Sequence, residues 1–165
     1  MASSVTRGLA VGATLFGGIL AGVTANRALV QLPAFERIGV IPWANLTRAE
    51  NHGIGSFFYP VVGLVALLLT AATAIAFRFD RSARGSRSFP IYTAVLLAIA
   101  AAVVTRGVLV PTMFSLRAAG DNAAELQRIF LVNARWWGVN DLLHVLTFGL
   151  NLWAFAEILS SPKRA

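Results

Sequence analysis

The sequence contains no cysteine, and only 13% of its 165 residues are charged. Without cysteine the chain has no disulfide, no cysteine-ligated iron–sulfur cluster and no thiol nucleophile. Soluble domains carry about 25% charged residues, so the scarcity of charge argues against a soluble domain. It also excludes intrinsic disorder, which requires low hydrophobicity and high net charge. A glycine-rich phosphate loop between a strand and a helix is missing, which excludes nucleotide-driven machinery.

Apolar residues make up 57% of the chain, and its mean hydropathy is +0.70. A soluble monomer could not bury so much apolar surface, so the composition indicates a membrane protein. Apolar runs of the length that a membrane span needs, about 18 residues, occur repeatedly. Four such runs cover residues 8–30, 54–77, 89–110 and 138–159. We therefore predict an all-α integral membrane four-helix bundle, a single domain of residues 1–165, with short interfacial helices in its outer loops.

Basic residues are concentrated in the connection between the second and third runs. It carries Arg78, Arg81, Arg84 and Arg87. Because cytoplasmic loops are enriched in Lys and Arg, we predict that this connection and both termini are cytoplasmic, and Lys163 and Arg164 agree. The Ala/Arg-rich composition suggests a bacterial source and hence the inner membrane. The net charge of +7 is spread along the chain, so membrane lipids are the expected partners and nucleic acid is not.

Trp and Tyr residues near the ends of the runs are typical of anchors at the membrane–water interface. The predicted outer belt contains Trp43, Tyr59, Trp136 and Trp137. The predicted inner belt contains Tyr92 and Trp153. Residues 121–135 mix apolar and charged side chains, which predicts an amphipathic helix on the outer surface. Pro42 indicates the start of a further interfacial helix.

Two pairs of glycines in the first run are typical of close helix packing. The pairs, each separated by three residues, are Gly8 with Gly12 and Gly18 with Gly22. Small residues at this spacing let two helix backbones approach each other. They predict packing within the bundle or between subunits, and a homo-oligomer is one expectation.

The few polar residues of the runs lie on stripes toward the predicted outer side. In the fourth run a helical stripe contains Asn140, His144, Thr147 and Asn151. In the second run a similar stripe contains His52, Ser56, Tyr59, Gly63, Ala66 and Thr70. Asn26 and Arg27 end the first run, and Arg106 lies near the end of the third. Because Arg106 is a cation within an apolar run, it needs a partner, for which Asp141 and Glu50 are the candidates, or it reaches the headgroups.

Several chemistries fit these residues. Asp141 and His144 have the spacing at which one helix supplies two metal ligands, and Glu50 and His52 could complete a metal site. His52 and His144 could instead ligate a b-type haem, or both could simply hydrogen-bond inside the bundle. As a third option, a histidine base accepts a proton from a weakly acidic carbon while a nearby arginine stabilises the anion. The cofactor therefore stays open between none, a metal ion and haem.

The layout resembles a family of small bacterial and fungal four-span proteins described as anthrone oxygenase-like. The resemblance covers nearly the whole chain and has four parts. They are Gly17-Gly18 running into Leu32-Pro33, Pro60 in the second span, Val110-Pro111 ending the third, and Trp136-Trp137 with Asn140 opening the fourth. The family pattern has an arginine three residues after Asn140, where this chain has Leu143 followed by His144.

The resemblance implies oxygenation of a lipophilic polycyclic anthrone to an anthraquinone. In this hypothesis His144 is the base, Asp141 orients it, Arg106 stabilises the anion and His52 assists. The expected substrate-binding residues are Asn26, Tyr59, Trp136, Trp137 and Asn140. The alternatives are a non-enzymatic four-span protein, either an accessory subunit or a small-molecule carrier, and a haem- or metal-dependent oxidase that uses both histidines.

Overall fold

The computed structural model describes residues 3–80 and 88–160, and all regular structure in these two segments is helical. Four continuous helical stretches within them are long and apolar enough to cross a membrane. They are Ser4–Ile38, Gly55–Phe79, Phe89–Ala118 and Ala123–Ser160. The predicted all-α membrane bundle is therefore confirmed. Arg81, Arg84, Arg87, Lys163 and Arg164, on which the predicted orientation partly rests, lie outside the described residues.

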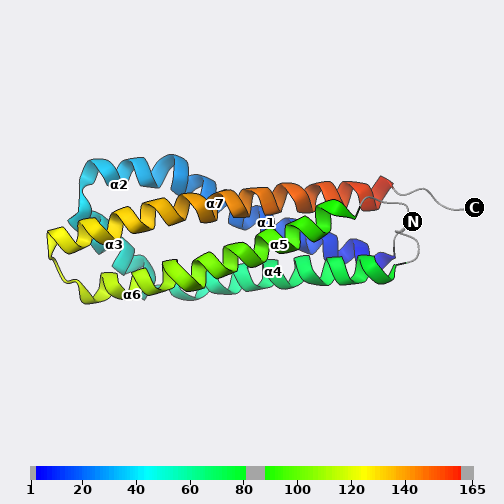
Figure 1. Ribbon diagram of the computed structural model, residues 1–165, viewed down its shortest axis with the longest axis horizontal. Helices are drawn as coiled ribbons and strands as arrows, with labels where there is room; N and C mark the ends of the chain where they lie inside the picture. Colours follow the sequence, from blue (N-terminus) through cyan, green and yellow to red (C-terminus); the bar gives the residue numbers. More distant parts are fainter. Residues whose placement is uncertain (1–2, 81–87, 161–165) are drawn as a thin grey trace, which may run out of the picture.

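The helical stretches divide into elements at two short π-helical segments (Figure 1). The first stretch contains α1 (Ser4–Asn26), the π segment η1 (Arg27–Gln31) and α2 (Leu32–Ile38). It is followed by α3 (Val40–His52) and α4 (Gly55–Phe79). The third stretch contains α5 (Phe89–Val104), the π segment η3 (Thr105–Leu109) and α6 (Val110–Ala118). The last helix, α7 (Ala123–Ser160), is unbroken.

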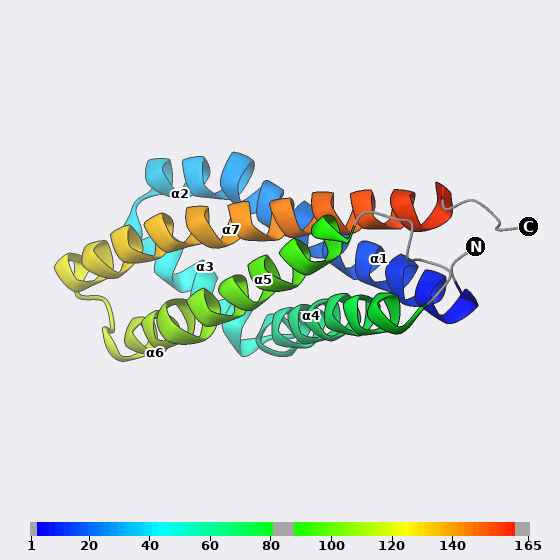
Figure 2. The ribbon, with the colours of Figure 1, turned by 45° about the vertical axis from the view of Figure 1, so that its right-hand side comes forward.

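The helices α1, α4, α5 and α7 form the bundle (Figures 1 and 2). Both α1 and α5 pack extensively along α7, and α4 packs along α1. Contact between α4 and α5 is the weakest of these pairings. At one end, the terminal end, α1 begins, α4 ends, α5 begins and α7 ends. At the other end α2, α3, α6 and the first turns of α7 form what we call the cap.

Glycines allow α1 to approach its neighbours closely. A Cβ atom added to Gly18 would lie 3.2 Å from the ring of Phe148 on α7, and one added to Gly12 would lie 3.2 Å from the side chain of Leu69 on α4. Within the two described segments, no neighbouring atom lies within 4 Å of the corresponding position at Gly8 or Gly22. One glycine of each predicted pair therefore packs inside the bundle. Self-association through the other two stays a prediction.

Both π segments lie just before a proline. The N–H of Leu32 bonds to the carbonyl of Arg27, and the N–H of Val110 bonds to that of Thr105, five residues back in each case. Pro33 and Pro111 follow immediately. Proline has no N–H and its ring crowds the preceding turn of an α-helix, so a wider π turn accommodates it without ending the helix.

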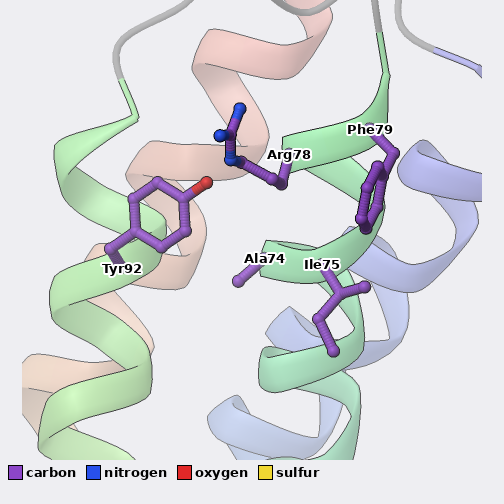
Figure 3. Close-up of a pocket in the computed structure, with 5 residues that line it drawn as sticks. All are labelled: Ala74, Ile75, Arg78, Phe79 and Tyr92. Atoms are coloured by element: carbon purple, nitrogen blue, oxygen red, sulfur yellow. The ribbon is translucent and has the colours of Figure 1, made fainter.

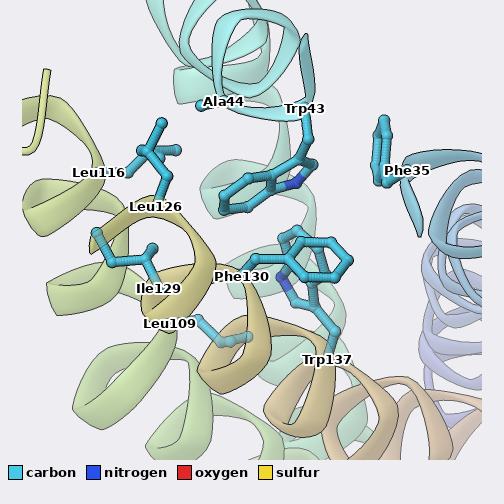
Figure 4. Packing of buried hydrophobic residues seen from close by; sticks show 9 residues of the cluster. All are labelled: Phe35, Trp43, Ala44, Leu109, Leu116, Leu126, Ile129, Phe130 and Trp137. Carbon is cyan, nitrogen blue, oxygen red and sulfur yellow. The ribbon is translucent and has the colours of Figure 1, made fainter. Parts of the chain in front are cut away.

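The cap has an apolar core of its own, centred on Trp43 of α3 (Figure 4). The Trp43 ring is fully buried and meets the rings of Phe130 and Trp137 edge to face, with centroid distances of 5.0 and 6.3 Å. The predicted outer belt is therefore wrong for Trp43 and Trp137, because the cap helices cover them. Tyr59, Tyr92 and Trp153 are exposed, as expected of interfacial anchors.

Arg48 fixes α3 to the chain that follows α6. Its guanidinium donates to the carbonyl of Leu116, at 3.1 Å from Nη2, and also to the carbonyl of Gly120. It forms an ion pair with Asp121, with an N–O distance of 3.2 Å. One arginine thus binds the carbonyl of Leu116 in the last turn of α6 and the carbonyl of Gly120 just after the helix.

Two expectations about the loops are wrong. Residues 121–135 do not form a separate surface helix, because α7 begins at Ala123 and its Leu126 and Ile129 are fully buried in the cap core. The stripe predicted from His52 to Thr70 is interrupted between α3 and α4. His52, Ser56 and Tyr59 are exposed, and only Ala66 and Thr70, deeper in the bundle, are buried.

Candidate functional site

Arg27 and Asp141 form an ion pair between the first π segment and α7. The guanidinium makes two hydrogen bonds, from Nη2 to Oδ1 and from Nε to Oδ2, the latter at 3.3 Å. The side chain of Asp141 is only 8% exposed and that of Arg27 is 22% exposed. The guanidinium also lies over the Trp137 ring, 5.3 Å from its centroid. The pair is therefore bidentate and largely shielded.

A shielded pair of this kind is sensitive to the loss of one partner. Removal of either residue leaves an uncompensated charge among apolar side chains, which costs more than the pair itself contributes. The sequence places Arg27 and Arg106 near this level, and it predicts that Arg106 either pairs with Asp141 or Glu50 or reaches the headgroups. The structure pairs Asp141 with Arg27, while Arg106 is exposed.

The second π segment contacts Asn140, the residue of α7 that precedes Asp141. Thr105 donates from its hydroxyl to Oδ1 of Asn140, at 3.3 Å, and Asn140 is buried. Arg27 and Thr105 are each the first residue of a π segment, and they reach adjacent residues of α7 from different helices. Wide turns of this type are frequent at functional sites because they redirect side chains.

His144 lies one turn beyond Asp141 on α7 and is partly buried. Beyond His144 the stripe continues inward with Thr147 and Asn151, both buried, and Asn151 donates from Nδ2 to the hydroxyl of Thr70 on α4, at 3.1 Å. The predicted interior stripe of the fourth span is therefore present. We call Arg27, Thr105, Asn140, Asp141 and His144 the polar cluster.

Several predicted site residues lie away from the polar cluster. His52 and Glu50 are exposed near the end of α3, and Asn26 and Tyr59 are also exposed. Trp136 is partly buried beside the cap core. Within residues 3–80 and 88–160, no three His, Asp or Glu side chains are grouped as a metal site requires. Of the predicted substrate-binding residues, Asn140 is in the cluster and Trp137 lies beside its arginine.

A second set of buried polar groups lies in the cap. Asn133 of α7 is fully buried, and neither its amide nitrogen nor its oxygen has a hydrogen-bond partner among the residues that the structure describes. The indole N–H of Trp43 is likewise buried without a partner. Asn133 is one turn from both Phe130 and Trp137, the residues on which Trp43 packs. Asn133 could not be recognised from the sequence, because a lone Asn in a segment of mixed polarity forms no pattern.

Comparisons of the chain with protein-family models, with curated proteins and with solved structures gave no match. The polar cluster is therefore the feature from which a function can be inferred.

Proposed function

We propose that the protein is a membrane oxidoreductase that oxygenates a lipophilic, anthrone-like polycyclic aromatic. The observation that supports this proposal is the placement of His144 one turn from the shielded pair of Arg27 and Asp141. A base beside a fixed cation is what abstraction of a proton from a weakly acidic carbon requires. The substrate class comes from the resemblance of the sequence to anthrone oxygenase-like proteins.

In this proposal His144 takes a proton from the ring carbon opposite the ketone. The negative charge that develops spreads to the ketone oxygen, where the Arg27 guanidinium stabilises it. Arg27 can do so without releasing Asp141, because its bonds to Asp141 use Nε and Nη2 and leave the Nη1 amino group for the substrate. Asp141 then acts as a positioning residue that holds the guanidinium in place.

The remaining steps use O2 as the oxidant and need no external reductant. The carbanion transfers an electron to O2, and the two radicals combine into a carbon-bound peroxide. The protonated imidazole of His144 returns its proton to the peroxide, and the hydroperoxide loses water to leave a second ketone. One O2 is consumed and one water is released for each anthrone, which requires neither metal nor haem.

The test is O2 uptake by the purified protein with an anthrone substrate. We expect His144→Gln to lower kcat by about 10²- to 10⁴-fold, the range for loss of a general base. Arg27→Gln should lower it more than Arg106→Gln, because Arg106 is exposed and outside the cluster. Arg37→Gln removes a charge from an exposed site on α2 and should leave turnover unchanged.

Unchanged turnover in His144→Gln would refute the catalytic role of the polar cluster. A protein that binds the anthrone without consuming O2 would instead support the carrier alternative. An absorption spectrum and metal analysis of the active preparation test the haem- and metal-dependent alternatives.

A further inference from the structure

A groove opens between α4 and α5 at the terminal end of the bundle (Figure 3). Its volume is about 460 Å³, and it is lined by Ala74, Ile75, Arg78 and Phe79 of α4 and by Tyr92 of α5. Most of the lining is apolar. The Arg78 guanidinium and the Tyr92 hydroxyl face each other across the gap between the two helices. The groove therefore has an apolar floor with a cation and a hydroxyl at one end.

The groove lies where the bundle is least tightly closed. The α4–α5 contact is the weakest of the four pairings around the bundle, and Ala74 provides little side chain to fill the space. The groove is largely open to the outside of the bundle, which in a membrane is surrounded by lipid. Its apolar floor is therefore presented to acyl chains.

The polar end of the groove lies at headgroup level. Arg78 is in the last turn of α4 and Tyr92 is in the first turn of α5, so both lie where a membrane span ends. Arg and Tyr side chains at this level reach toward phosphate groups while their apolar parts stay in the hydrocarbon. A phosphate between Arg78 and Tyr92 would thus lie at its ordinary depth.

Charge favours an anionic occupant. The ion pairs found among the described residues involve Arg27, Arg48 and Arg128, and none involves Arg78. Asp80, the carboxylate nearest to Arg78 in the sequence, accepts hydrogen bonds from the N–H of Ser3 and the hydroxyl of Thr6. The net charge of the chain is +7. Basic residues between membrane helices at the headgroup level are a common means of binding acidic lipid.

We propose that this groove binds an anionic phospholipid. The phosphate accepts hydrogen bonds from the Arg78 guanidinium and the Tyr92 hydroxyl, and one acyl chain lies along Ala74 and Ile75. A free phosphate ion would use only the polar end of the groove, so the apolar floor identifies the occupant as a lipid. This site is separate from the polar cluster and does not depend on the proposed oxygenase activity.

The test is native mass spectrometry of the protein in detergent with an equimolar mixture of phosphatidylglycerol and phosphatidylcholine. We expect the wild type to retain phosphatidylglycerol preferentially. Arg78→Gln should reduce that preference about fivefold, the factor that one basic residue near a membrane surface contributes. Arg78→Lys should keep part of it, and Tyr92→Phe should weaken binding of both lipids. Arg37→Gln is the matched control, since it removes one exposed charge at the cap.

Equal losses in Arg78→Gln and Arg37→Gln would show that net charge alone attracts the lipid and would overturn the proposal. Absence of a preference in the wild type would also overturn it. Competition by inorganic phosphate that leaves no lipid bound would assign the site to a free anion. A melting temperature recorded for each variant without added lipid separates loss of binding from loss of the fold.

Discussion

At the scale of single residues, Asn133 and Asn140 form a natural pair for comparison. They lie two turns apart on α7, and both are buried. The Asn140 side chain accepts a hydrogen bond from Thr105, whereas the Asn133 amide has no partner. A buried polar group without a partner costs about 1 to 3 kcal/mol relative to an apolar group of similar shape.

We therefore predict opposite effects of the same substitution at the two sites. Asn133→Leu should raise the free energy of unfolding by about 1 to 3 kcal/mol, because it removes an unsatisfied amide from an apolar core. Asn140→Leu should lower it, because the Thr105 hydroxyl loses its acceptor. Thermal unfolding in detergent gives both values. A decrease of similar size in the free energy of unfolding of both variants would mean that the Asn133 amide also has a hydrogen-bond partner.

Only some residues of the candidate site could be predicted from the sequence. His144 and Asp141 could be found because polar residues are rare in the fourth span. The choice between Arg27 and Arg106 could not be made, because it depends on which way each side chain faces around its helix. Thr105 faces α7, and successive residues are rotated by about 100°, so Arg106 points elsewhere.

At the scale of elements, Gly39 determines how the cap begins. Its N–H bonds to the carbonyl of Phe35 at the end of α2, and its carbonyl accepts from the N–H of Trp43 in α3. Its φ of 89° and ψ of 169° lie in a region that residues with a Cβ rarely adopt. One residue thus ends α2, starts α3 and places Trp43 in the cap core.

We predict that Gly39→Ala destabilises the protein by about 1 to 3 kcal/mol, through backbone strain alone. No neighbouring atom of the described part of the chain lies within 4 Å of the new Cβ, so steric crowding does not contribute. Gly22→Ala is the control, since it adds the same methyl group to an exposed helical position with equally open surroundings. In thermal unfolding, Gly22→Ala should leave the stability of the protein unchanged or raise it. Equal effects of the two substitutions would contradict the role of the positive φ.

The spans could be predicted well as elements, and the cap could not. Each span is an apolar run whose length matches the bilayer, which hydropathy detects directly. The cap helices mix apolar and charged residues, as surface-lying helices also do. Trp43 and Trp137 therefore suggested interfacial anchors, although neighbouring helices bury them. Burial by other parts of the chain is a tertiary property that local composition does not reveal.

At the scale of the whole molecule, the absence of cysteine makes the membrane topology easy to measure. A single introduced cysteine would be the only thiol in the chain. Ser3 and Ser160 are exposed at the terminal end, and Ala34 and Asn122 are exposed in the cap. Labelling from one side of the membrane can therefore be assigned to one end of the bundle.

With cytoplasmic termini, an impermeant maleimide added to intact spheroplasts should label Ala34→Cys and Asn122→Cys. It should label Ser3→Cys and Ser160→Cys only after the membrane is permeabilised. The reverse pattern would show that the arginine distribution misleads about orientation. Labelling of one member of each pair would contradict the arrangement of the bundle itself.

The two π segments also affect how this chain can change by insertion or deletion. Each contains one residue more than an α-helical turn would, which shifts the helical phase by about 100° between the span and the cap helix beyond it. Span and cap can therefore each keep the rotation that suits their own neighbours. Deletion of one residue from 105–109 would turn Leu116 out of the cap core while leaving α5 in place. In a relative that lacks the extra residue of a π segment, the alignment gap would fall within that segment. The cap of such a relative would be packed differently.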